Sequence, residues 1–138
     1  MTKEEKEILL RDLGTRIGTD TKLSIDSMNG LYSLHLIGET MITVKHISSS
    51  KLYYFPIAEV KPFLRPLSNM TDEEREEFRS RDGVMSYSSQ HDSWALCAFS
   101  ATAFDWLGEN HFDYRGLIPK GLANEAPEGM YEIAPSSI

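Results

Sequence analysis

The side chains best suited to chemistry lie close together between residues 104 and 118. This segment holds four aromatic residues, two aspartates, one histidine and one arginine, and it follows a mostly apolar run. Large aromatic rings bury much surface, so the polar groups among them must find partners or remain in water. We therefore expect a binding site here, formed by His111, Tyr114 and Arg115.

A cysteine nucleophile is one chemistry that this segment could support, with Cys97 as the thiol, His111 as the base and Asp113 as the orienting group. Such a set requires a partly exposed thiolate. Cys97, however, lies among apolar neighbours in a predicted helix, where cysteine usually packs as a small hydrophobic residue. The sequence favours a structural role for Cys97, and we predict no catalytic residue.

A metal site is a second possibility, because His91 with Asp92 and His111 with Asp113 offer four nitrogen and oxygen ligands. Their spacing matches no strong zinc motif. The helix predicted between the two pairs would hold them roughly 22 Å apart at its rise per residue. We therefore expect neither a metal ion nor another cofactor.

Acidic residues and Arg115 allow two further interpretations. A paired-carboxylate hydrolase could use Asp105 with Glu109 or Asp113, but residues four apart are also typical of a solvated helix face. Arg115 could clamp a carboxylate or phosphate of a ligand. The alternative, which we favour, is an ion pair between Arg115 and Asp105 or Asp113 that holds the loop on the core.

The composition is that of one small globular domain. The chain has 138 residues, of which 41% are hydrophobic and 25% charged, and its formal net charge is −7. This acidic balance disfavours nucleic-acid binding, because phosphate backbones would be repelled. The single cysteine, the charged first residues and the lack of a long apolar run predict a cytoplasmic protein without a membrane partner.

The first half of the chain predicts a helix followed by strands. A capping-box pattern at Thr2 and Glu5 begins a helix over 3–13. Between residues 22 and 55, alternating apolar and polar residues separated by short turn sequences predict an antiparallel meander of three to four strands. The prolines between residues 56 and 66 then predict a helical turn and an extended connector.

The second half predicts two more helices. Thr71 and Glu74 form a second capping-box pattern, which begins a helix over 72–80. A loop follows over 82–92. Residues 94–108 then predict a buried helix, because their apolar side chains would surround most of its circumference.

Together these elements predict an α+β fold. A small antiparallel meander of three to four strands would pack on the buried C-terminal helix, with two shorter helices beside them. We expect a single domain over 1–127 and a loosely ordered tail over 128–138.

Two blocks of the sequence carry a resemblance. They comprise residues 61–74 (KPFLRPLSNMTDEE), and residues 104–107 (FDWL) followed by 111–123 (HFDYRGLIPKGLA) and 125–127 (EAP). In these blocks the chain resembles a group of small uncharacterised proteins encoded in gut-bacterial genomes and their phages or other mobile elements. The resemblance implies a bacterial or phage cytosol and transfers no catalytic residue.

The sequence thus favours a phage- or prophage-type accessory protein that acts as a non-enzymatic macromolecule-binding module, with a protein as its partner. Aromatic residues and one arginine near predicted loops match the composition of interface hot spots. Two alternatives stay open: a small hydrolase or nucleotide-acting enzyme centred on His111, Asp113 and Arg115, and a homo-oligomeric structural protein. A pocket over these three residues would favour the enzyme, whereas their burial as a structural cluster or a flat apolar patch would favour the binding module.

Overall fold

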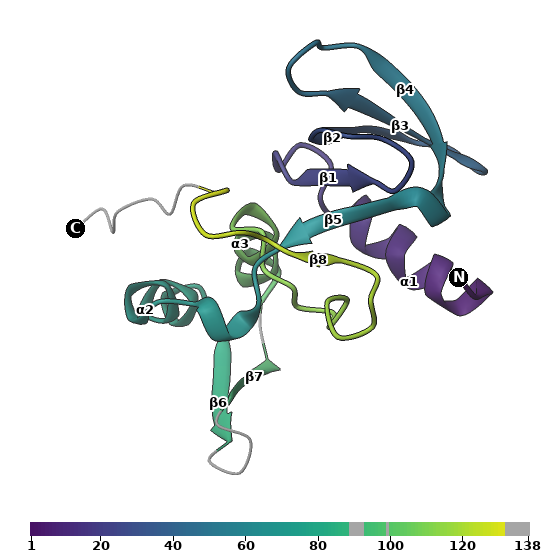
Figure 1. Ribbon diagram of the computed structural model, residues 1–138. Helices are drawn as coiled ribbons and strands as arrows, with labels where there is room; N and C mark the ends of the chain where they lie inside the picture. The colour runs from purple at the N-terminus through teal and green to yellow at the C-terminus, as the bar shows by residue number, and fades with distance from the viewer. Residues whose placement is uncertain (89–92, 99, 132–138) are drawn as a thin grey trace.

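The structure, a computed structural model, describes residues 1–88, 93–98 and 100–131, with the backbone alone for residues 85–88 and 93–98. In this part of the chain, a six-stranded and mostly antiparallel sheet is combined with a two-stranded hairpin and three α-helices (Figure 1). The predicted α+β class is therefore confirmed. No helix among these residues is long and apolar enough to cross a lipid bilayer.

The first helix, α1 (Lys3–Gly14), begins at the predicted capping box. The hydroxyl of Thr2 accepts the backbone N–H of Glu5 at 3.1 Å, and the Glu5 carboxylate accepts the N–H of Thr2 at 2.9 Å. Leu9 and Leu13 are fully buried in the same hydrophobic cluster as the sheet. The predicted first helix is confirmed, and its apolar side covers the sheet.

Four consecutive strands form the larger part of the sheet, and neighbouring strands pair antiparallel in the order β4-β3-β2-β1. On the third strand, Ile42 and Val44 are buried in the core, whereas Met41 and Lys45 are exposed. One face of the sheet therefore packs on α1 and the other faces solvent. The four strands are β1 (Lys22–Ile25), β2 (Tyr32–Ile37), β3 (Met41–His46) and β4 (Leu52–Pro56).

The sheet has six strands rather than the predicted three to four. The expected helical turn is the 3-10 helix η1 (Ile57–Glu59), but the expected connector forms β5 (Val60–Leu64), which pairs antiparallel with β1. The sixth strand, β8 (Asn124–Glu125), pairs parallel with only the last two residues of β5. Pro62 lies before that pairing, which is why a residue without an N–H fits in this strand.

A second 3-10 helix, η2 (Leu67–Asn69), leads into α2 (Asp72–Ser80), whose bounds match the prediction. Its capping box forms as expected: the Thr71 hydroxyl accepts the N–H of Glu74 at 3.1 Å, and the Glu74 carboxylate accepts the N–H of Thr71 at 3.0 Å. Local hydrogen bonding therefore defines the start of this helix.

The region from 82 to 98 corrects the sequence prediction. Residues of the expected loop and the first part of the expected long helix instead form two antiparallel strands, β6 (Val84–Ser88) and β7 (Ser93–Ala98). Residues 89–92 of the expected loop lie outside the described part of the chain. The third helix, α3 (Ala101–Glu109), begins later, because the Ser100 hydroxyl accepts the N–H of Ala103 at 3.2 Å and caps it. An apolar run without a clear period suits a buried strand as well as a buried helix.

The hydrophobic residues form two clusters. The first joins α1, the inner face of the sheet and apolar residues of the segment 117–123. The second joins α2, α3 and Phe112, and it includes the fully buried Phe78 and Leu107. The sheet is therefore covered by α1, whereas α3 packs with α2 at the other end of the molecule (Figure 1). The predicted packing of the sheet on the C-terminal helix is not confirmed.

Candidate functional site

The segment that follows α3 is held against the end of β5. The N–H of Arg65 donates to the carbonyl of His111 at 2.7 Å, and the N–H of Asp113 donates to the carbonyl of Arg65 at 2.8 Å. This isolated parallel bridge fixes the backbone between residues 111 and 113. The backbone that carries His111 and Asp113 is therefore hydrogen-bonded to the end of β5.

His111 is half-buried and has two defined partners. Its Nδ1 lies 2.9 Å from the hydroxyl of Thr21, and its ring stacks on that of Tyr131 with centroids 3.8 Å apart. Burial and, to a smaller extent, the positive charges of Arg16, Lys22 and Arg65 together lower the pKa of His111 from 6.5 to about 4. The imidazole is therefore neutral at pH 7, and its stacked face is not free for a ligand.

We expect His111 to make the stability of the fold sensitive to acid. Because its pKa in the folded chain lies below that of the unfolded chain, its contribution is complete above about pH 6.5 and is lost as the pH falls towards 4. The variant His111→Asn suits the backbone angle φ of 63°, which asparagine tolerates. Urea unfolding at several pH values should show a shallower loss of stability between pH 6.5 and 4 in the variant. Equal slopes would contradict this assignment.

Tyr131 links the neighbouring strands β1 and β5 through its hydroxyl. Its hydroxyl accepts the N–H of Lys22 at 2.8 Å and donates to the carbonyl of Phe63 at 2.7 Å. The register that pairs Leu23 with Pro62 puts Lys22 and Phe63 next to each other, so the hydroxyl bridges β1 and β5. Burial raises the pKa of Tyr131 to about 12, so it remains a hydrogen-bond donor. The part of the predicted tail beyond residue 131 lies outside the described residues.

Tyr114 and Arg115 face α1 instead of His111. The hydroxyl of Tyr114 lies 2.5 Å from that of Thr15, and Nε of Arg115 lies 3.6 Å from the carboxylate of Asp12. Asp12 also accepts two hydrogen bonds from Arg16, at 2.7 and 3.1 Å. The fully buried carboxylate of Asp12 thus lies within 4.0 Å of two guanidinium groups, those of Arg16 and Arg115. The predicted partner of Arg115, Asp105 or Asp113, is corrected to Asp12.

The side chain of Asp113 has a structural role. Its two carboxylate oxygens accept the backbone N–H groups of Leu117 and Ile118, at 2.8 and 2.9 Å. Bonded in this way, Asp113 closes the turn after His111 and does not orient its imidazole, whose Nδ1 faces Thr21. Cys97 lies in β7 rather than in a helix, so the predicted setting of that residue is corrected.

Metal-binding groups are not gathered in the described part of the chain. No cluster of three or more histidine, cysteine or acidic side chains forms there. His91 and Asp92, two of the four ligands considered from the sequence, lie outside the described residues.

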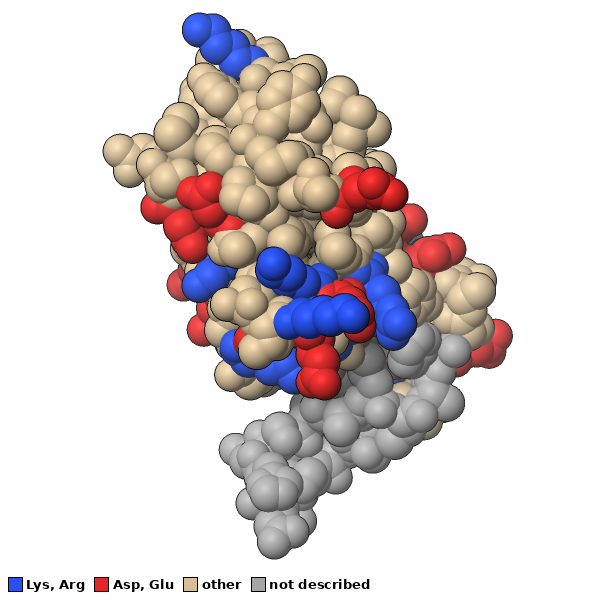
Figure 2. All heavy atoms as spheres, turned by 90° about the vertical axis from the view of Figure 1, so that its right-hand side faces the viewer, with Lys and Arg blue, Asp and Glu red and all other residues tan. Residues whose placement is uncertain are grey.

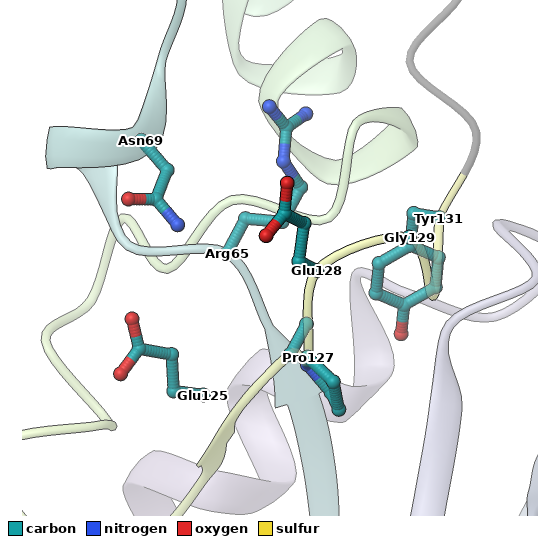
Figure 3. Close-up of a pocket in the computed structure, with 8 residues that line it drawn as sticks. Arg65, Asn69, Glu125, Pro127, Glu128, Gly129 and Tyr131 are labelled. Carbon is teal, nitrogen blue, oxygen red and sulfur yellow. The ribbon is translucent and has the colours of Figure 1, made fainter.

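An open cavity of about 610 Å³ lies between β5, η2 and the segment 125–131 (Figure 3). Arg65 lines it, but the guanidinium donates to both carboxylate oxygens of Glu74, at 2.8 and 2.9 Å. Glu125 and Glu128 are the remaining charged residues of its wall. The charged groups of this cavity are therefore one ion-paired guanidinium and two carboxylates.

The second cavity, of about 370 Å³, lies between the end of α1 and α3. Tyr114 lines it together with Asp105 and Glu109. Both acidic residues are exposed, as expected for a solvated helix face. Neither of these two cavities is lined by His111 or Arg115, and these two side chains contact different partners, Thr21 and Asp12.

An exposed apolar surface lies on the opposite end of the molecule, on the solvent side of the sheet. Leu36 pairs with Thr43, and Thr43 pairs with Tyr54, so these side chains form a row across β2, β3 and β4. Leu36 is 60% exposed and Tyr54 is 66% exposed. With Met41 and Leu52, which are also exposed, they form what we call the outer apolar patch.

A bulge creates part of this patch. The register between β2 and β3 shifts between Leu34 and Leu36. Leu34 therefore lies opposite the buried Val44, whereas Leu36 lies opposite Thr43 on the outer face. Simple alternation along β2 would have put both leucines on one side. Sequence reasoning missed the patch for this reason.

Charged residues are sparse around the outer apolar patch. Between residues 31 and 58 the acidic side chains are limited to Glu39, and the basic ones to Lys45 and Lys51. In Figure 2 the upper part of the surface, over the β2–β4 end of the sheet, is largely uncharged, and most acidic side chains lie lower down. The net negative charge is therefore carried by the rest of the chain.

Comparisons with protein-family models, with curated proteins and with solved structures found no match.

Proposed function

We propose that this chain is a non-enzymatic protein-binding module and that the outer apolar patch is the surface it presents to its partner. The exposure of Leu36 and Tyr54 in one row is the observation that carries the proposal. Contiguous apolar side chains on a soluble domain commonly mark an interaction site, and tyrosine is enriched among interface hot spots.

The interactions of the predicted site residues support binding over catalysis. His111 is stacked and neutral, Asp113 is bonded to two backbone N–H groups, and Arg115 faces Asp12. A hydrolase would need at least a base and a reacting group around one cavity. On the resemblance of its two sequence blocks, we further propose that the protein serves as an accessory factor of a bacteriophage or mobile element in a bacterial cytosol.

The variant Leu36→Asp tests this function, because it places a charge in the patch on a side chain that is 60% exposed. In capture from a host-cell lysate, quantified by mass spectrometry, we expect partner recovery to fall at least about tenfold. Glu76→Ala, on the exposed side of α2, is the matched control and should recover the partner as the wild type does. Equal recovery with Leu36→Asp would refute the proposed surface.

A further inference from the structure

We propose that the free edge of β4 pairs antiparallel with β4 of a second copy of this chain, giving a dimer with one continuous sheet. This inference rests on the proposed function only in that the dimer would join two outer apolar patches. Its own basis is the edge strand, its sequence and the distribution of charge.

Among the residues that the structure describes, β4 ends the sheet and pairs on one side only, with β3. The hairpin between them closes with the N–H of His46 donating to the carbonyl of Lys51 at 2.8 Å. Antiparallel ladders alternate from such a pair, so the backbone groups of Tyr53 and Phe55 point to β3. Those of Leu52 and Tyr54 point to the open side.

Natural sheets usually protect such an edge with charged side chains, an internal proline or a bulge. None of these occurs from Leu52 to Phe55, and Pro56 comes only at the end of the strand. The β3–β4 register also runs without a shift. An unprotected edge of this kind is a template for another strand.

The sequence of β4 is compatible with itself in the antiparallel direction. Centring the twofold axis on Tyr54 places this residue opposite its own copy and Leu52 opposite the copy's Pro56. Two hydrogen bonds then join the Tyr54 residues, and each Leu52 N–H donates to the carbonyl of Pro56. The proline needs no acceptor in this register, and apolar or aromatic residues face each other throughout.

Charge favours a second copy at this end of the molecule. The chain carries a net charge of −7, so two copies repel each other over most of their surfaces. The segment 31–58 carries Glu39 as its acidic residue beside Lys45 and Lys51, so contact through β4 keeps the acidic parts apart. Side by side, Tyr54 and Leu52 of both copies would extend the outer apolar patch across the dimer axis.

Sedimentation of the purified chain over a range of concentrations tests the dimer. We expect the sedimentation coefficient of the wild type to shift from that of a monomer to that of a dimer as its concentration rises. Tyr54→Pro removes the edge N–H and should raise the dissociation constant of the dimer about tenfold or more. Tyr54→Thr keeps this N–H and should still dimerise. A wild type that stays monomeric throughout would overturn the proposal.

A charge exchange at the axis tests the register. Tyr54→Lys and Tyr54→Glu should each be monomeric, because like charges would lie opposite each other. Their mixture should form a mixed dimer, detected by native mass spectrometry. A mixture that remains monomeric would exclude this register. Purified chains alone are used here, and Leu36→Asp leaves β4 unchanged, so failure of the dimer and failure of partner binding can be distinguished.

Discussion

Replacing Asp12 with alanine is expected to lower the free energy of unfolding by about 3–5 kcal/mol, since it removes the counter-ion of a buried guanidinium. The side chains of Asp12 and Arg16 are both fully buried and lie 2.7 Å apart. Arg115 also points its Nε at the same carboxylate, at 3.6 Å. Without Asp12, Arg16 would keep only its hydrogen bond to the carbonyl of Phe112.

Urea unfolding followed by circular dichroism measures this effect. The matched control is Glu76→Ala, which removes an exposed ion pair with Arg79 and should change stability by no more than about 0.5 kcal/mol. An Asp12→Ala variant as stable as that control would show that the cluster around Asp12 does not hold the C-terminal segment on α1.

Replacing Glu74 with alanine should have an effect of similar size, about 3–5 kcal/mol. Its carboxylate accepts two hydrogen bonds from the buried Arg65 and also caps α2 through the N–H of Thr71. Glu74→Gln keeps one acceptor oxygen, which can accept from both Arg65 Nη2 and the Thr71 N–H, and should be less destabilising than Glu74→Ala. Equal losses in the two variants would mean that the hydrogen bonds of Glu74 contribute little.

The ion pair between Glu74 and Arg65 also makes the stability of the fold depend on pH. Burial by itself raises the pKa of Glu74, but hydrogen bonds from Arg65 and Thr71 and the charge of Arg65 together lower it below its ordinary value of 4.5. Since the pKa in the folded chain is lower than in the unfolded chain, the stability gained is present above about pH 4.5 and is lost at lower pH. Melting curves of the wild type and Glu74→Gln should therefore converge as the solution is acidified below that value.

Local signals explain which parts of the fold could be predicted. The capping boxes at Thr2 and Thr71 involve residues three apart, so the sequence alone locates the starts of α1 and α2. Alternation likewise revealed the first four strands. The start of α3 was missed for two reasons. The mostly apolar run from Trp94 to Leu107 shows no period that distinguishes a strand from a helix. The N-cap at Ser100 was also not recognised.

The candidate site was less predictable because its contacts join distant residues. His111 was identified, but its partners Thr21 and Tyr131 lie 90 residues before it and 20 residues after it. The Asp12–Arg16 pair has helical spacing and looks like an ordinary surface ion pair. Only the packing of the segment after α3 on the end of α1 buries it.

The outer apolar patch, in turn, depends on one bulge. Leu34 and Leu36 alternate in the sequence as two residues of one face, yet the register shift between them sends Leu36 to solvent. The register between β2 and β3 therefore determines whether Leu36 is exposed. The alternation of residues along β2 alone does not reveal this exposure.

Site-specific photo-crosslinking in the native host tests the central claim most directly. A photoreactive phenylalanine derivative is placed at position 36, in the outer apolar patch, or at position 76, on the exposed side of α2. The account predicts an adduct with a different protein from position 36 and little or none from position 76. No adduct at position 36, or equal adducts at both positions, would contradict the assignment of this face as the binding surface.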